Sequence, residues 1–398
     1  MTLKLAFVVQ RYGTDIAGGA EQHCRQIVEH CTDDFDIEVL TTTARDYKAW
    51  VGAGDYAPGD EKIGGVTVRR FPVERRRRLW SFVWRTRMIH RLPHSLRQEL
   101  KWIEAQGPYA PQLVRFVGEH RGDYDAFAFY CYRYYPTFFG ARAAGDKAVL
   151  VPTAERDWAI HMPVYRELFD RTRGFIFLTE EERALVRSVA NTQTTISTVV
   201  GLGVEMPPGP GEPGRFSRKY LGGARFLLYL GRIDANKGCP GMFDYALRYY
   251  KERPGCNTPL VLAGAQAMET PRHKRIHSLG FLSEEEKFDA LYDCDLLIMP
   301  SPHEGLSVAT LEAMAMGRPV VANAKGETPA GHCRRSGGGI AYRNYGEFAK
   351  ALDDLTADAD KRAQLGAAGQ RYVAENYTWP IVRRKVRDFF ETFVGKKD

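Results

Sequence analysis

Residues 301–312 hold the side chains of this chain that are best suited to chemistry. Two carboxylates, Glu304 and Glu312, lie eight positions apart, and an apolar run at 296–299 precedes them. Ser307 belongs to the residue types that cap helices, and small and apolar residues follow it. The pattern predicts a strand, a loop and a helix whose free N-terminal amides and dipole attract a diphosphate.

These positions match the parts of a nucleotide-sugar. We expect the amides of Gly305 and Leu306, beside Ser307, to bind the diphosphate. Glu312, inside the predicted helix, can reach the two hydroxyls of a ribose, and Glu304, on the loop, can contact a sugar. The alternative is a buried helix with two incidental acids, and the segment by itself does not separate the two interpretations.

A pair of cations follows a second apolar run, at 226–230. Gly231 ends that run, and Arg232 and Lys237 come next, five positions apart. A departing diphosphate needs fixed positive charge, which Arg supplies as a fork and Lys as a point charge. Singly, each could be a solvated surface cation. Together, at the carboxyl end of a predicted strand with the acid pair downstream, they favour a phosphate site.

Five motifs along the chain carry a family resemblance: Gly18-Gly19-Ala20-Glu21, Gly231-Arg232 with Lys237, Gly280-Phe281-Leu282-Ser283, Glu304 with Glu312, and Gly317-Arg318-Pro319-Val320-Val321. With them the chain resembles the retaining glycosyltransferases of family 4 over nearly its whole length. That family has the GT-B architecture, two Rossmann-like α/β domains facing across a cleft. Its last helix crosses back to the first domain.

The resemblance implies roles for the donor-binding residues. Glu312 holds the ribose, Glu304 contacts the donor sugar, and Phe281 and Leu282 line the base pocket. The family retains the anomeric configuration, by same-face attack in which the leaving phosphate accepts the proton of the acceptor, so no separate protein base is required.

Two further expectations come from the residues themselves. Breaking the bond between the anomeric carbon and the phosphate puts negative charge on the diphosphate, and we expect Arg232 and Lys237 to stabilise it. We expect Gly18 and Gly19 to let an opposing backbone approach without a Cβ clash.

One position departs from the family pattern. After the apolar run at 148–151, related sequences carry Thr-Ala-His-Asp, with the histidine on the donor sugar, whereas this chain has Glu155 at that position. His161, six residues on, is a candidate replacement, or a surface or core histidine. Our hypothesis is that Glu155 reshapes the sugar pocket for a donor or acceptor with an amino group.

The organisation of the chain follows from its alternating apolar strands and helical stretches, which predict parallel α/β units. We expect an acceptor-binding domain at 1–200, a nucleotide-sugar-binding domain at 201–375 and a returning helix at 376–398. The Pro/Gly-rich residues 201–223 read as the linker. Because ligands of open α/β sheets bind outside the carboxyl ends of strands, the cleft between the domains is the expected active site.

Composition narrows the class of protein. The 398 residues contain seven scattered cysteines without metal-ligand spacing, which suggests reduced thiols in a cytoplasmic protein. No apolar run approaches the length of a membrane span or of a signal-peptide core.

The formal net charge of +7 is concentrated in residues 69–102, where ten arginines and one lysine alternate with aromatic side chains. Such a segment suits the anionic inner face of a membrane, where lipid-linked acceptors reside. The alternative is a solvated helix whose aromatics pack on their own domain. Nucleic acid binding is disfavoured because no recognised binding motif accompanies the charge.

Metal-assisted transfer is the first alternative chemistry. Asp293 and Asp295 form an Asp-x-Asp pattern, but they lie where a helix gives way to a strand, so we expect a structural use and no essential metal or other cofactor. A hydrolase using Glu304 and Glu312 as acid and nucleophile would leave the Arg/Lys pair unexplained.

We therefore expect a metal-independent transferase that moves a sugar from a nucleotide-diphosphate sugar to a polysaccharide, lipid-linked or small-molecule hydroxyl. Two alternatives stay open. A nucleotide-sugar epimerase of the same fold would act on the donor alone, and a non-catalytic nucleotide-sugar-binding protein would bind the donor without turnover. A nicotinamide oxidoreductase is disfavoured because the glycines fail the Gly-x-Gly-x-x-Gly spacing. The sequence identifies neither base, sugar nor acceptor.

Overall fold

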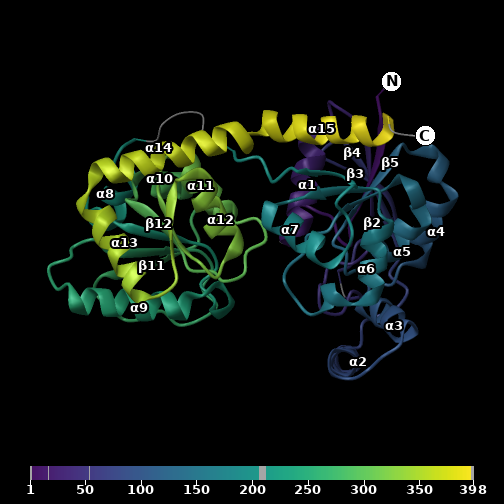
Figure 1. Cartoon of the computed structure of the whole chain (residues 1–398), viewed down its shortest axis with the longest axis horizontal. Helices are drawn as coiled ribbons and strands as arrows, with labels where there is room; N and C mark the ends of the chain where they lie inside the picture. The colour runs from purple at the N-terminus through teal and green to yellow at the C-terminus, as the bar shows by residue number, and fades with distance from the viewer. Residues whose placement is uncertain (1, 17, 53, 206–211, 396–398) are drawn as a thin grey trace. The chain divides into compact units, whose positions relative to one another are not determined.

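The computed structural model describes residues 2–16, 18–52, 54–205 and 212–395 and consists of two compact units (Figure 1). Unit 1 comprises Met1–Leu202 together with Val382–Asp398, and unit 2 comprises Gly203–Ile381. Each unit is an α/β layer structure built on one sheet, as the alternating pattern predicts.

The sheet of unit 1 has eight strands in the order β3-β4-β2-β1-β5-β6-β7-β8. All neighbours are parallel except β3 and β4. The strands are β1 (Lys4–Val8), β2 (Asp36–Thr42), β3 (Gly59–Ile63), β4 (Val66–Phe71), β5 (Ala126–Tyr130), β6 (Ala148–Val151), β7 (Gly174–Phe177) and β8 (Ile196–Val199).

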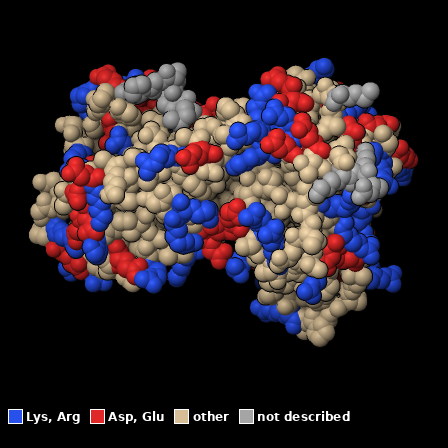
Figure 2. Space-filling view, turned by 45° about the horizontal axis from the view of Figure 1, so that its top comes forward, with Lys and Arg blue, Asp and Glu red and all other residues tan. Residues whose placement is uncertain are grey.

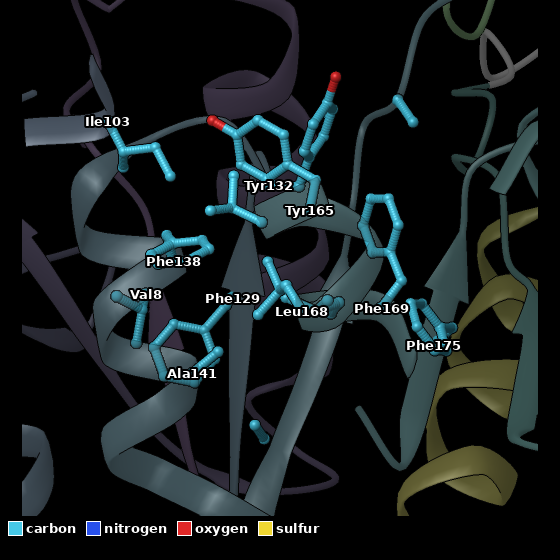
Figure 3. Packing of buried hydrophobic residues seen from close by; sticks show 14 of the residues in the cluster. Val8, Ile103, Phe129, Tyr132, Phe138, Ala141, Tyr165, Leu168, Phe169 and Phe175 are labelled. Atoms are coloured by element: carbon cyan, nitrogen blue, oxygen red, sulfur yellow. The ribbon is translucent and has the colours of Figure 1, made fainter. Parts of the chain in front are cut away.

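An aromatic-rich core covers one face of this sheet (Figure 3). Phe129 and Phe175 from the strands pack there against Phe138, Tyr165 and Phe169 from the helices, all of them buried. The helices of unit 1 are α1 (Gly19–Cys31), α2 (Leu79–Arg91), α3 (Leu96–Gln106), α4 (Pro111–Glu119), α5 (Tyr135–Ala144), α6 (Pro163–Arg171) and α7 (Glu180–Val189).

The last helix, α15 (Trp379–Gly395), returns to unit 1 from Val382 onward, which confirms the predicted crossing back. The ring of Phe390 packs against Phe7 at 6.3 Å between centroids. A Cβ added to Gly174 would lie 2.7 Å from the ring of Phe393, so this close approach requires glycine.

The sheet of unit 2 has six strands in the order β11-β10-β9-β12-β13-β14, and every neighbouring pair is parallel. The strands are β9 (Leu227–Leu230), β10 (Leu260–Ala263), β11 (Ile276–Gly280), β12 (Leu296–Met299), β13 (Val320–Asn323) and β14 (Gly339–Tyr342). They are short, and β9, β10 and β12 at the centre are apolar on both faces, as expected for a parallel sheet covered by helices on both sides.

Two cores flank this second sheet. Leu228 faces the core that includes Leu311 and Met314, and its neighbour Leu227 faces the core that includes Phe243 and Leu352. The covering helices are α8 (Arg215–Leu221), α9 (Cys239–Glu252), α10 (Glu284–Asp293), α11 (Val308–Ala315), α12 (Glu327–Ser336), α13 (Tyr345–Ala357) and α14 (Ala359–Asn376).

The linker predicted at 201–223 is wrong in its second half. Helix α8 occupies residues 215–221 and belongs to unit 2, because the Asp293 carboxylate accepts hydrogen bonds from the amides of Gly214, Phe216 and Ser217 at 2.7, 2.9 and 3.1 Å. The run Pro207-Pro208-Gly209-Pro210-Gly211 lies outside the described residues.

Candidate functional site

The strand order of unit 2 creates a switch point between β9 and β12. From β9 the chain moves outward through β10 and β11, then returns to place β12 on the other side of β9. The loops after these two strands lie beside the switch point at the carboxyl edge, which is where open α/β sheets bind ligands. Those loops are the two segments singled out by the sequence, 231–238 and 300–307.

Lys237 and Glu304 meet at this switch point. Lys237 ends a short 3-10 helix (Ala235–Lys237), and its Nζ lies 2.8 Å from Oε1 of Glu304 on the loop after β12. Gly238 brings the two loops together, because its φ is +75° and an added Cβ would lie 2.3 Å from the carbonyl oxygen of Pro300. The sequence indicated the cation and the acid but not this glycine.

The loop between β12 and α11 is held in place by three side chains that donate hydrogen bonds to its carbonyl oxygens. Asn323 donates to Pro300 at 3.1 Å, Ser301 donates to His303 at 2.9 Å, and Thr328 donates to Gly305 at 3.4 Å. Within the described ranges, the amides of Gly305 and Leu306 have no protein acceptor. They are the free donors that the sequence predicted for a diphosphate.

Ser307 differs from its predicted role. Its φ and ψ are 60° and 54°, in the left-handed region, and its side chain caps no amide of α11. Instead its Oγ lies 2.8 Å from Oγ1 of Thr310. A serine held in this conformation is strained, and strain of this kind concentrates where the backbone is shaped for a ligand.

Glu312 has a partner that the sequence did not indicate. Its carboxylate lies 2.8 Å from Nζ of Lys287 on α10, and that ammonium also contacts Glu284 at 2.7 Å. Burial raises the pKa of Glu312, and Lys287 opposes that rise. The pKa of Lys287 is also raised: burial lowers it, but the two carboxylates outweigh burial. The result is a nearly buried carboxylate that is oriented by an ammonium.

Arg232 lies on the same loop as Lys237 but does not join its ion pair. Its Nε is 3.1 Å from the carboxylate of Asp234, and its side chain is 57% exposed. The carbonyl oxygen of Arg232 accepts a hydrogen bond from the buried Tyr229 hydroxyl at 2.7 Å. The preceding Gly231 has a φ of +150°, and this conformation turns the chain out of β9.

The two residues predicted for the base pocket behave differently. Phe281, directly after β11, is 85% exposed, whereas Leu282 is buried in the core. Phe281 therefore forms no wall of a closed pocket. An exposed ring at a strand end offers instead an open surface on which a base can stack.

The Asp-x-Asp pattern has structural uses. Asp293 holds the start of α8, and both carboxylate oxygens of Asp295 accept from Nε of Arg225 at 3.0 Å. Across the described ranges, no group of three or more His, Cys, Asp or Glu side chains is arranged to hold a metal ion. All seven cysteines lie in those ranges and are free thiols.

Gly18 and Gly19, the glycine pair at the start of α1, have different surroundings. A Cβ on Gly18 would lie 2.0 Å from the carboxylate of Glu21, which folds back over the start of α1 and pairs with Arg11 at 2.7 Å. A Cβ on Gly19 would meet nothing within 4 Å in the described structure. Gly18 thus leaves room for the carboxylate of Glu21 in the buried Arg11–Glu21 pair, and the predicted approach of an opposing backbone stays a prediction.

Glu155 follows β6 at the carboxyl edge of the unit 1 sheet and is exposed, with no ion-pair partner among the described residues. The loop that carries it is fixed by Glu182, whose buried carboxylate accepts from the amides of Ala154 at 2.7 Å and Leu178 at 2.6 Å. Burial raises the pKa of Glu182 to about 7. Residues 179–182 have the Thr-Glu-Glu-Glu pattern of a capping box, and the Thr179 side chain does accept from the amide of Glu182 at 3.1 Å. The carboxylate of Glu182 also holds the loop of Ala154. His161 is exposed at the end of a short 3-10 helix.

Comparison with known proteins finds a family match in unit 2 and several relatives. Residues 224–358 match the family model described as glycosyl transferases group 1. The chain is 26% identical over 277 residues to a GDP-mannose-dependent alpha-(1-6)-phosphatidylinositol monomannoside mannosyltransferase of Mycobacterium tuberculosis, a match covering 63% of this chain and 71% of that one. A related enzyme of Corynebacterium glutamicum, the GDP-mannose-dependent monoacylated alpha-(1-6)-phosphatidylinositol monomannoside mannosyltransferase, is 24% identical over 173 residues, 40% of this chain and only 45% of the relative's length.

Solved structures agree on the fold over the whole chain. Sucrose-phosphate synthase from Thermosynechococcus elongatus has a TM-score of 0.67 at 15% identity, with 99% of both chains covered. An Escherichia coli trehalose-6-phosphate protein bound with UDP-2-fluoro glucose has a TM-score of 0.69 at 13% identity, with 98% of this chain and 99% of that chain covered.

The solved structures share the GT-B fold with this chain, and unit 2 matches the glycosyl transferases group 1 family over residues 224–358. Both findings support the family 4 resemblance stated from the motifs.

Proposed function

We propose that the protein is a retaining, metal-independent transferase that moves a sugar from a nucleoside-diphosphate sugar to a hydroxyl acceptor. The observation that carries the proposal is the Lys237–Glu304 pair, 2.8 Å apart, beside the free amides of Gly305 and Leu306 at the switch point of unit 2. A cation, an acid and two amide donors at one switch point suit a diphosphate whose sugar lies against the acid.

Each side chain then has a defined part in the reaction. Lys237, with Arg232 from the same loop, stabilises the negative charge that develops on the diphosphate as the bond to the anomeric carbon breaks. Glu304 contacts the sugar and holds Lys237 in place. The acceptor oxygen bonds to the anomeric carbon on the face that the phosphate leaves, and the hydroxyl proton passes to a phosphate oxygen. No protein base is needed for this transfer.

The ribose and base have candidate partners on the same edge. Glu312, oriented by Lys287, accepts hydrogen bonds from the ribose hydroxyls, and the exposed ring of Phe281 stacks on the base. Metal independence is supported by the engagement of Asp293 and Asp295 in helix capping and in the Arg225 pair, which leaves neither for a metal at the diphosphate.

The first test is thermal-shift binding against uridine, guanosine and adenosine diphosphate sugars, with GDP-mannose included because the named relatives depend on it. We expect one donor class to stabilise the wild type, and Lys237→Ala and Glu312→Ala to lose that stabilisation. Lys251→Ala, which removes an exposed lysine on α9, is the matched control. If no donor shifts the unfolding temperature, or if all three variants respond like the wild type, the site assignment is wrong.

Turnover separates the two alternatives. An epimerase of this fold would change the donor in the absence of any acceptor, and a non-catalytic binding protein would bind the donor but leave it intact under every acceptor. We expect nucleoside diphosphate release that depends on an acceptor, and NMR of the product should show the anomeric configuration of the donor.

We also propose peripheral contact with the inner face of a membrane through α2. Trp80 and Trp84 of this helix are 75% and 59% exposed, and Val83 and Met88 are exposed near them. Arg87, also exposed, lies on the same helix. Within the described ranges no helix is long and apolar enough to cross a membrane. Exposed tryptophans mixed with arginines suit the headgroup region of an anionic bilayer.

Vesicle sedimentation tests this contact. We expect the protein to sediment with phosphatidylglycerol vesicles more than with phosphatidylcholine vesicles. Trp80→Ser with Trp84→Ser should weaken that binding about ten-fold or more, because it removes two indoles that become buried in the bilayer. Tyr220→Ser, a partly exposed aromatic of unit 2, is the control. Equal sedimentation of the tryptophan variant and the wild type would contradict the contact.

A further inference from the structure

A hollow of about 560 Å³ lies at the carboxyl edge of the unit 1 sheet, between the loop after β4, helix α2 and the end of α3. Its lining is dominated by cations with a single carboxylate. The charged lining residues are Arg75, Arg76, Arg77, Arg78, Arg85, Lys101 and Glu104. On the projecting part of unit 1 that carries α2 and α3, Lys and Arg side chains border uncharged surface (Figure 2).

The carboxylate of this hollow neutralises only one of the cations. Glu104 lies 3.5 Å from Arg75, whose guanidinium also covers the ring of Tyr109 at 3.3 Å. Through the part of the chain that the structure describes, Arg78 and Arg85 form no ion pair. The cations around this hollow thus converge on one space without matching acids, and a low-dielectric wall strengthens the field of such an arrangement.

Arg77 is the strongest indication that this space is built for an anion. The residue is 91% buried, and its guanidinium donates only to carbonyl oxygens, those of Lys48 at 2.8 Å, Tyr47 at 2.5 Å and Gln106 at 3.4 Å. Burial lowers its pKa, and no carboxylate lies within ion-pair distance among the described residues. The rings of Tyr47, Trp50 and Phe82 also lie 5.0–5.6 Å from this guanidinium. A buried cation held by neutral oxygens and aromatic rings, without a carboxylate, is costly, and a bound anion would compensate its charge.

A second hollow of about 540 Å³ shares Arg77 and Phe82 with the first. Its lining is more apolar, and it includes Leu79, Val83 and Trp102. It also includes two polar residues with an unpartnered buried atom, Gln106 through Oε1 and Arg133 through Nε.

This second hollow continues toward Glu155. Arg133 comes three residues after the end of β5, and its guanidinium pairs at 2.7 Å with Asp157, two residues beyond Glu155. In unit 1 the switch point lies between β1 and β5, so Arg133 stands where ligands of such sheets bind. The cationic hollow, the apolar hollow and Glu155 thus lie along one edge of one sheet.

We infer that the two hollows form the acceptor site, and that the acceptor carries a phosphate ester next to an apolar portion. The phosphate occupies the cationic hollow, the apolar portion lies along Leu79, Phe82 and Trp102, and the hydroxyl that is glycosylated points toward Glu155. A doubly charged phosphate with three acceptor oxygens suits several guanidinium groups better than a single carboxylate would. The acceptor role rests on the proposed transferase function, whereas the phosphate site stands on the hollow itself.

The binding test uses inorganic pyrophosphate on a protein whose unit 2 diphosphate cations are removed by Arg232→Ala with Lys237→Ala. In this background we expect pyrophosphate to bind, and Arg78→Ser with Arg85→Ser to weaken that binding about ten-fold, since two guanidinium contacts are lost. The matched control is Arg87→Ser with Arg91→Ser, which removes the same charge from the same helix outside the hollow, and it should change affinity about two-fold at most. Ligand-free unfolding temperatures show whether each variant is folded.

Equal weakening by both pairs of substitutions would overturn the inference, and so would the absence of pyrophosphate binding in a folded background protein. Nucleotide-sugar binding to the wild type is measured separately. Binding of pyrophosphate through Arg78 and Arg85 without any donor binding would keep the anion site and refute its acceptor role.

Vesicles identify the source of the phosphate. If sedimentation with phosphatidylcholine vesicles requires added phosphatidic acid, is competed by pyrophosphate and falls much more in the Arg78/Arg85 variant than in the Arg87/Arg91 variant, the acceptor phosphate is borne by a lipid. If pyrophosphate binds through Arg78 and Arg85 but vesicle binding responds equally to both pairs, the site takes a water-soluble phosphate ester.

Discussion

The close packing of the two site loops at Gly238 gives a prediction that needs no knowledge of the substrate. Gly238→Ala places a Cβ 2.3 Å from the carbonyl oxygen of Pro300 at a residue whose φ is +75°. Because Gly238 directly follows Lys237, relief of that overlap has to move the loop that brings Lys237 to Glu304. The substitution therefore tests both stability and the geometry of the site.

Two terms set the expected loss of stability. A left-handed conformation costs an L-residue about 1–2 kcal/mol. Overlap with a backbone atom that cannot swing aside adds about 1–3 kcal/mol. The sum is about 2–5 kcal/mol for Gly238→Ala. Gly222→Ala is the matched control, since Gly222 lies in the same unit with a φ of +61° and nothing within 4 Å of an added Cβ. The control should lose only the first term, about 1–2 kcal/mol.

Urea unfolding of the two variants measures the difference, and the entropy that alanine removes from the unfolded chain cancels between them. Nucleoside diphosphate affinity should fall in Gly238→Ala and stay unchanged in Gly222→Ala. If both variants lose the same stability, or if Gly238→Ala binds nucleotide as tightly as the wild type, the close approach at Gly238 does not position Lys237.

Three further predictions concern single charged groups. Lys237→Met should lower kcat about 100- to 1,000-fold with little change in unfolding, because it removes a cation fixed at the leaving phosphate; steady-state kinetics with an accepted donor measures this, and an unchanged kcat would refute the role. Burial lowers the pKa of His23 from 6.5 to about 4. The neutral imidazole therefore adds about 3 kcal/mol to the free energy of unfolding above pH 6.5, and this stabilisation is lost as the pH falls through 4. In unfolding experiments, His23→Gln should remove this loss of stability at acid pH. Burial raises the pKa of Glu182 from 4.5 to about 7, so here stability falls as the pH rises. Relative to Glu182→Gln, the free energy of unfolding of the wild type should fall by about 3 kcal/mol as the pH rises from 4.5 through 7. A difference between the two proteins that does not change with pH would show that the pKa of this carboxylate is not shifted.

The parts of the site that the sequence predicted are those fixed by topology. Parallel strands bring their carboxyl ends to one edge, so a cation after one apolar run and an acid after another were expected to be neighbours, and Lys237 and Glu304 are. Arg232 shows the limit of this reasoning. Arg232 lies after the expected strand, but its guanidinium pairs with the neighbouring Asp234, and no periodicity in the sequence predicts that pairing.

The residues that the sequence missed act through contacts between elements. Lys287 did leave a signal, because a lysine in the first turns of a helix is unfavourable to the helix dipole and calls for another reason. That reason is Glu312, 25 positions away. Glu182 matched a local capping pattern, and only the fold shows that its carboxylate also accepts from the amide of Ala154, 28 positions away.

The return of α15 to unit 1 has a consequence for synthesis. Unit 2 is one continuous segment and is complete once residue 381 has left the ribosome, whereas unit 1 lacks a covering helix until Val382 and the residues after it follow. Until then, the sheet face bearing Phe7 and Gly174 has no Phe390 or Phe393 to cover it. The unit that begins first is therefore finished last, and its open apolar face is a natural binding surface for chaperones during translation.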